Sequence, residues 1–149
     1  MWLNNNLTII GAAALIAALL LPVASTMADS GEIKITEDRR KACAKAEKQF
    51  NKVFPDYKPE HGVVIVKLHK YNFCPANLTV KVGTTVRWIN VDRRTSHSVW
   101  LKQAGLAESD RLFPEEIWQH TFNESGAYPY LCGPHWKDED MLGHVKVVK

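Results

Sequence analysis

The feature that most constrains the fold is a change of hydrophobic period at Gly62. From Gly62 to the C-terminus, apolar and polar residues alternate in short runs, and Gly83 marks a tight connection between two of them. A run of this kind presents one apolar and one polar face when it is extended. The runs predict strands at residues 63–69, 78–82, 85–90, 97–101, 117–122, 127–132 and 143–148. Because half-apolar strands bury their apolar faces by packing two sheets together, we predict an all-β sandwich.

The stretch before Gly62 has a helical period instead. Thr36 is a suitable N-cap, and Pro55 ends the pattern. Between them, apolar residues recur on one face, and lysines and arginines fill the others; the apolar positions are Cys43, Ala46, Phe50 and Phe54. We therefore predict one α-helix that packs its apolar face against the sandwich.

The N-terminal segment is apolar and lacks charged side chains. Residues 1–28 contain no Asp, Glu, Lys or Arg. This composition is typical of an export signal, although the run is also close to the roughly 20 residues of a membrane anchor. We expect a signal peptide at 1–28, with an uncleaved anchor as the alternative, then a linker and helix at 29–60 and the main domain at 61–149. Both alternatives place the main domain outside the cytoplasm, and we expect it in the periplasm.

Length and charge narrow the classes of function. A chain of 149 residues suits one domain with its own core. The net charge of +3 is mildly basic and lacks the clustered cations of a nucleic-acid surface. We therefore expect no nucleic-acid partner, and contact with a membrane only if the N-terminal segment is retained.

Residues with metal chemistry gather near the C-terminus. A predicted strand ends at Cys132, His135 follows in a Cys-x-x-His spacing, and Met141 comes after a short loop. Together with His97 from an upstream predicted strand, they supply two imidazoles, one thiolate and one thioether. This is the ligand set of a blue copper electron-transfer site. The remaining histidines are expected on the surface or on strands, without a ligand role; they are His61, His69, His120 and His144.

The cysteine count adds a constraint. In an exported chain, three cysteines leave one thiol over after pairing. Cys132 is that thiol if it binds a metal ion. Cys43 lies on the docking face of the predicted helix and Cys74 precedes Pro75. We therefore predict a Cys43–Cys74 disulfide that joins the helix to the sandwich.

Residues 71–149 resemble the plastocyanin, pseudoazurin and amicyanin branch of the cupredoxins. The resemblance rests on four ordered segments: residues 73–90, residues 92–99, the run Gly-x-Tyr-x-Tyr-x-Cys-x-Pro-His that ends at His135, and residues 141–147. It implies a Greek-key β-sandwich whose first matching segment is a hairpin. It also implies one copper ion that cycles between Cu(II) and Cu(I), held by His97, Cys132, His135 and Met141. The implied function is a type 1 copper carrier of single electrons and not an enzyme.

Two positions depart from the family pattern. Five residues separate His135 from Met141, where the family commonly has four, or two in amicyanin-like members. The residue after the first ligand histidine is Ser98, where the family commonly has Asn. A backbone N–H at position 98 can still point at the sulfur, but the side-chain bracing of the loop would differ.

Redox carriers form transient complexes. We expect a monomer whose partners are redox proteins such as a c-type cytochrome, a terminal oxidase or a dehydrogenase. The acidic run 138–140 in the ligand loop could attract a basic partner, and Pro134 and Trp136 flank His135 as a candidate docking patch. A copper storage or delivery protein with the same ligands is the alternative. An iron superoxide reductase would need further clustered histidines, which the spacing does not show.

Overall fold

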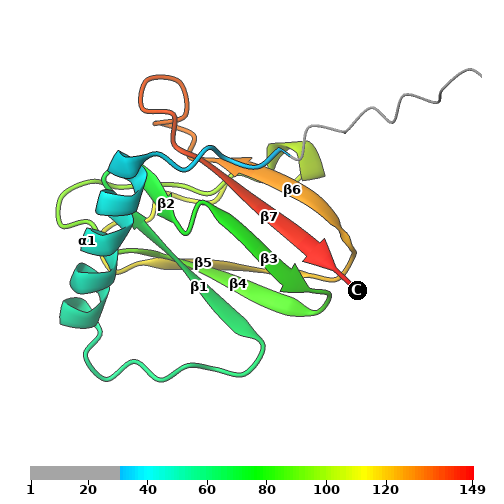
Figure 1. Cartoon of the computed structure of the whole chain (residues 1–149), viewed down its shortest axis with the longest axis horizontal. Coiled ribbons are helices and arrows are strands. Elements are labelled where there is room, and N and C mark those ends of the chain that lie inside the picture. The colour runs from blue at the N-terminus through cyan, green and yellow to red at the C-terminus, as the bar shows by residue number, and fades with distance from the viewer. Residues whose placement is uncertain (1–30) are drawn as a thin grey trace, which may run out of the picture.

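The computed structural model describes residues 31–149, and Figure 1 shows a two-sheet β-sandwich with one helix packed on its side. The elements are α1 (Glu37–Val53), β1 (Val63–His69), β2 (Asn72–Cys74), β3 (Asn77–Lys81), β4 (Thr84–Asn90), the 3₁₀ turn η1 (Lys102–Ala104), β5 (Ile117–Phe122), β6 (Gly126–Leu131) and β7 (Leu142–Val148). The predicted all-β sandwich with an added N-terminal helix is confirmed. The predicted signal segment lies outside the described residues, and within 31–149 no helix has the length and apolar character needed to cross a membrane.

The strand order is β2-β1-β4-β5 in one sheet and β3-β7-β6 in the other. β1 pairs in parallel with β4, and β3 pairs in parallel with β7. The predicted hairpin between β3 and β4 is therefore wrong, because these two strands lie in different sheets. The tight connection itself is present at Gly83, where φ is +86°. It crosses between the sheets because Val82 N donates to Val148 O in one sheet and Gly83 N donates to Phe122 O in the other.

Two other strand predictions need correction. Residues 97–101 do not form a regular strand; His97 bridges to Leu112, while Trp100 bridges to Leu131 of β6. The segment changes its partner halfway along, so no continuous ladder forms. The short strand β2 was not predicted, because three residues are too few for an alternating pattern.

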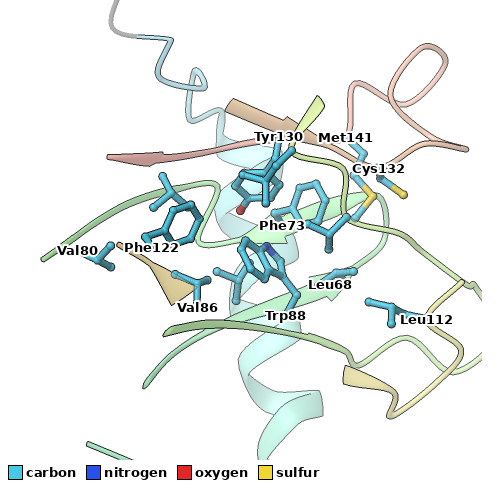
Figure 2. Close-up of a cluster of buried hydrophobic side chains, with 14 of the residues drawn as sticks. Leu68, Phe73, Val80, Val86, Trp88, Leu112, Phe122, Tyr130, Cys132 and Met141 are labelled. Atoms are coloured by element: carbon cyan, nitrogen blue, oxygen red, sulfur yellow. The ribbon is translucent and has the colours of Figure 1, made fainter. Parts of the chain in front are cut away.

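The main core lies between the sheets. Figure 2 shows Trp88 of β4 at its centre, with Phe73 and Tyr130 packed above it and Cys132 and Met141 at one end. The Tyr130 ring lies 4.7 Å from the Phe73 ring and 5.3 Å from the Trp88 ring, centroid to centroid. Tyr130 also covers Gly143 of β7, where an added Cβ would lie 2.2 Å from the ring. The donor Cys132 is therefore held by the packed core itself.

Helix α1 covers the opposite face of the β2-β1-β4-β5 sheet. Its N-cap is Thr36, whose hydroxyl accepts a hydrogen bond from Arg39 N at 3.2 Å, as predicted. Ala46 and Phe50 are buried in a second apolar cluster that includes Ile89 of β4. Ile89 follows Trp88, so the two side chains point to opposite faces of the sheet. The helix thus adds a layer that residues 61–149 alone do not have.

The predicted disulfide is confirmed. Cys43 of α1 is bonded to Cys74 of β2, with an S–S distance of 2.05 Å and a Cα–Cα distance of 5.2 Å. Among the described residues, Cys132 is the free cysteine, and it is buried. The disulfide joins the added helix to the edge of the sandwich, as the sequence indicated.

Candidate metal centre

Three of the four predicted ligands converge at one end of the sandwich. Cys132 Sγ lies 3.8 Å from His97 Nδ1 and 3.3 Å from His135 Nδ1. The three donor atoms all lie within 4.8 Å of one another. His97 and Cys132 are fully buried, while His135 is partly exposed at the surface. The structure therefore brings two imidazoles and one thiol to a single point.

These separations suit one metal ion. A metal bonded to sulfur and nitrogen at about 2.0–2.3 Å, with the donors arranged in a triangle, requires donor atoms about 3.5–4 Å apart. One soft sulfur and two imidazole nitrogens match copper in both of its common oxidation states. Burial raises the pKa of the Cys132 thiol, and hydrogen bonds from Ser98 act in the opposite direction. A bound metal ion removes the thiol proton outright.

Ser98 braces the loop that carries the sulfur. Its backbone N–H donates to Cys132 Sγ at 3.4 Å, the arrangement that the sequence left open. Its hydroxyl accepts from Gly133 N at 2.9 Å and donates to Glu108 Oε1 at 2.6 Å. An added Cβ at position 133 would lie 1.9 Å from that carboxylate oxygen, so a larger residue there would displace the Glu108 carboxylate from Ser98. Glu108 was not predicted, because it comes from a stretch without a hydrophobic period.

A buried carboxylate orients His97. His97 Nε2 donates to Asp92 Oδ2 at 2.7 Å, which leaves Nδ1 facing Cys132. The same carboxylate accepts from Lys70 N at 2.9 Å, and its other oxygen lies 2.9 Å from His69 Nδ1 as an ion-pair contact without hydrogen-bond geometry. Burial acts to raise the pKa of Asp92, but the hydrogen bonds from His97 and Lys70 and the electrostatic attraction of His69 and His97 together outweigh it, so the net pKa lies below its usual range.

Metal-binding histidines commonly donate their second ring nitrogen to a carboxylate or a backbone carbonyl, which fixes the tautomer and the ring orientation. Asp92 occupies that place for His97. The sequence carried a usable signal, a carboxylate five residues before the ligand histidine, but the separate contribution of His69 from β1 depends on the tertiary fold. Neither residue was predicted as part of the site.

Tyr71 packs against both imidazoles. Its ring centroid lies 4.9 Å from that of His135 and 6.3 Å from that of His97. Tyr71 and Lys70 form the two-residue turn between β1 and β2, and both have positive φ, +60° and +47°. Non-glycine residues in this conformation are strained by about 1–3 kcal/mol each. The fold tolerates this turn while it places the Tyr71 ring on the imidazoles and Lys70 N on Asp92.

His135 and Met141 lie on the loop between β6 and β7. Burial lowers the pKa of His135, and the positive charges of His97 and Arg111 lower it further. Met141 is buried and its carbonyl accepts from Cys132 N at 3.1 Å. Figure 2 shows the Met141 side chain beside Cys132. Its position is compatible with the predicted axial role, and its bond to a metal remains a prediction.

The added helix also reaches this loop. Arg39, in the first turn of α1, donates to the carbonyl oxygen and to Oδ2 of Asp140, both at 2.8 Å. Asp140 has a φ of +51° and directly precedes Met141. In Figure 1 the β6–β7 loop stands beside the start of α1. The helix therefore holds the C-terminal end of the β6–β7 loop, while Ser98 holds its N-terminal end.

The other histidines stay outside the donor cluster. His69 and His144 are buried on strands, His61 is exposed, and the His120 ring stacks on Trp118. Among residues 31–149, His97, Cys132 and His135 form the single group of donors close enough together to hold a metal. The exposed side chain beside the site is Trp136, which follows His135.

Comparison with known proteins agrees with this geometry. The profile of the family described as copper binding proteins, plastocyanin/azurin family, matches residues 61–148. The chain is 32% identical to amicyanin from Paracoccus versutus over 76 residues, which cover 48% of this chain and 57% of that protein. It is 36% identical to amicyanin from Paracoccus denitrificans over 78 residues, covering 50% and 59%. The match thus spans less than two thirds of these curated relatives.

Solved structures give the same answer for the fold. The reduced form of a tryptophan-to-tyrosine mutant of amicyanin is 30% identical, with a TM-score of 0.54, over 61% of this chain and 87% of that one. The Cu(I) form of a methionine-to-alanine mutant of amicyanin is 32% identical, with a TM-score of 0.54 and the same coverage. The match of the family profile over more than half of the chain, together with a preformed donor set suited to copper, shows that this chain belongs to the plastocyanin/azurin family of copper-binding proteins.

Proposed function

We propose that this protein is a type 1 copper electron carrier. The ligands are His97 Nδ1, Cys132 Sγ and His135 Nδ1, with Met141 as a weak axial ligand. The observation that carries the proposal is the convergence of one sulfur and two imidazole nitrogens at distances of 3.3 and 3.8 Å inside a packed sandwich. The copper ion would supply a one-electron couple between Cu(II) and Cu(I).

The surroundings of the ligands favour electron transfer over metal storage. His97 is fixed by Asp92, Cys132 by Ser98 and the core, and the β6–β7 loop by Arg39. A site held on so many sides has little freedom to rearrange when its charge changes, which suits a carrier. A storage or delivery protein must instead open to release its metal. His135 is the ligand that is partly exposed, so its edge is the proposed point of electron entry and exit.

The remaining aspects of the function follow from this assignment. We propose that residues 61–149 form the copper domain, that residues 29–60 add the linker and helix, and that residues 1–28 direct export to the periplasm. The protein would act as a monomeric carrier and not as an enzyme. Its partners would be redox proteins such as a c-type cytochrome, a terminal oxidase or a dehydrogenase.

The visible spectrum of the Cu(II)-loaded protein tests the proposal. We expect an intense thiolate-to-copper absorption band that disappears in Cys132→Ser and persists in His61→Gln, the exposed-histidine control. A weak spectrum that is the same in both variants would contradict the ligand assignment. Voltammetry then separates the two functions. A carrier gives a reversible one-electron wave without loss of metal, whereas a storage protein loses copper to a Cu(I) chelator during the cycle.

A further inference from the structure

A cavity of about 800 Å³ opens beside the metal centre. It lies between α1, the β1–β2 turn and the loop after β4. Its walls include the side chains of Lys70, Tyr71, Arg93 and Arg94, and His69 and Asp92 lie at its floor. The proposed function makes no use of this cavity.

The cavity carries positive charge. Lys70, Arg93 and Arg94 are exposed, and within residues 31–149 none of the three forms an ion pair. Asp92 is the carboxylate of the lining, and it is buried and engaged by His97 and by Lys70 N. The three cations are therefore not neutralised by a neighbouring acid in the described part of the chain. Such a wall attracts an anionic group.

The cavity shares a wall with the donor cluster. Tyr71 lines the cavity and packs on both imidazoles, at 4.9 Å from the His135 ring and 6.3 Å from the His97 ring. Its φ of +60° belongs to the two-residue β1–β2 turn, which fixes where the ring lies. A group seated in the cavity would be separated from the ligands by one aromatic ring.

The β6–β7 loop carries less unpaired negative charge than its sequence indicates. Of its three acids, Asp140 is paired with Arg39 at 2.8 Å, which leaves Asp138 and Glu139. Lys137 precedes these two in the same loop. The described residues thus leave three unpaired cations in the cavity lining, and two unpaired acids beside a lysine in the ligand loop.

We propose that the cavity is the docking site for an acidic surface of the redox partner, with partner carboxylates on Arg93, Arg94 and Lys70. The proposal rests on the proposed function, since it names the chemistry of the partner. Electrostatic attraction of this kind accelerates encounter and weakens as ionic strength rises. A basic partner on Asp138 and Glu139 is the competing outcome.

Paramagnetic mapping tests the location without any electron transfer. Hexacyanochromate(III), an anionic complex that is redox-inert under these conditions, is titrated into the ¹⁵N-labelled protein recovered from the periplasm, both metal-free and in the Cu(I) form. We expect selective broadening of the amides of Lys70, Tyr71, Arg93 and Arg94. Broadening near Asp138 and Glu139 by a cationic chromium(III) complex, without broadening at the cavity by the anion, would overturn the proposal, as would uniform weak broadening from both probes.

Charge reversal then tests the effect on rate. Hexacyanoferrate(II) gives one electron to Cu(II), producing hexacyanoferrate(III) and Cu(I), and the reaction is followed by stopped flow at low ionic strength. The double variant Arg93→Glu, Arg94→Glu should slow this reaction by about tenfold or more. The matched control is Lys45→Glu, Lys48→Glu, which makes the same change in net charge on exposed positions of α1.

The control should slow the reaction much less, and an equal loss in both double variants would show a general charge effect and overturn the proposal. Failure here is distinct from failure of the proposed function. If copper gives no thiolate band, the electron-carrier assignment fails whatever the chromium map shows. If the band and the voltammetric wave are present but the cavity amides do not respond to the anion, the docking proposal alone fails.

Discussion

Removing the Cys43–Cys74 disulfide should destabilise the protein by a predictable amount. The two cysteines are 31 residues apart in the sequence. In the chain-entropy relation, a closed loop of this length lowers the entropy of the unfolded chain by about 12 cal/mol/K, which is about 3.7 kcal/mol at 25 °C. The variant Cys43→Ala, Cys74→Ala should therefore lose about 3.7 kcal/mol of unfolding free energy.

The assay is urea unfolding of the metal-free protein, followed by tryptophan fluorescence. Metal-free protein is needed because copper bound to the native state would add its own stabilisation. The dependence of the unfolding free energy on urea should also increase, because the open chain exposes more surface when it unfolds. The wild-type protein with its disulfide reduced is the matched control, and its urea midpoint should equal that of the variant.

The helix should stay docked in the variant, because Ala46 and Phe50 keep their apolar contacts with the sheet. The copper absorption band of the variant should therefore match that of the wild type. If the variant loses less than about 1 kcal/mol of unfolding free energy, the disulfide does not stabilise the protein by restricting the unfolded chain, and the reasoning is wrong. A band that is lost together with the disulfide would show instead that the disulfide holds the metal loop in place.

Three further predictions concern single residues. Ser98→Ala should lower the unfolding free energy by about 0.5–1.5 kcal/mol, because the partly buried Gly133 N and the Glu108 carboxylate lose their hydrogen-bond partner, and should keep the copper band, since the backbone N–H to the sulfur remains; urea unfolding and a visible spectrum check both. Gly143→Ala should cost about 1–3 kcal/mol, because its Cβ would lie 2.2 Å from the Tyr130 ring; an unchanged urea midpoint would contradict this packing. Burial lowers the pKa of His144 from its ordinary 6.5, so its contribution to stability is full above that pH and is lost as the pH falls through the lower folded value. Urea midpoints at pH 7.5 and 5.5 should differ less in His144→Gln than in the wild type, and His61→Gln should leave the difference unchanged.

The local patterns of the sequence were sufficient for the architecture. Alternation at residues 63–69 and 117–122 predicted the bounds of β1 and β5, and Thr36 and Pro55 predicted the limits of α1. Cys132 and His135 could be predicted as a pair because they are only three residues apart, so a single turn of chain brings their donor atoms together. The Cys43–Cys74 pair followed because the apolar face of a helix must contact the sandwich.

Features that depend on the choice of partner could not be predicted in this way. The segment 97–101 alternates like a strand, but its backbone groups are divided between Leu112 and β6. Likewise, the apparent β3–β4 hairpin is a crossing, because pairing with β7 and β1 decides the sheet of each strand. A hydrophobic period predicts which face of a strand is buried, but it does not predict which neighbouring strand supplies the hydrogen bonds.

The supporting residues of the site were missed for a related reason. Asp92, Glu108 and Tyr71 act through contacts with residues from other elements, and Arg39 reaches the ligand loop from a helix that lies outside the part matched by the family profile. The identity of a carboxylate or an aromatic residue does not show which imidazole it will touch. Only the tertiary structure brings these groups to the donors.

Anomalous scattering at the copper edge, from crystals of the copper-loaded protein, tests the central claim most directly. We predict a single strong peak about 2.0–2.3 Å from His97 Nδ1, Cys132 Sγ and His135 Nδ1. A main peak at another histidine, or a Cys132 sulfur that makes no bond to the metal, would contradict the account.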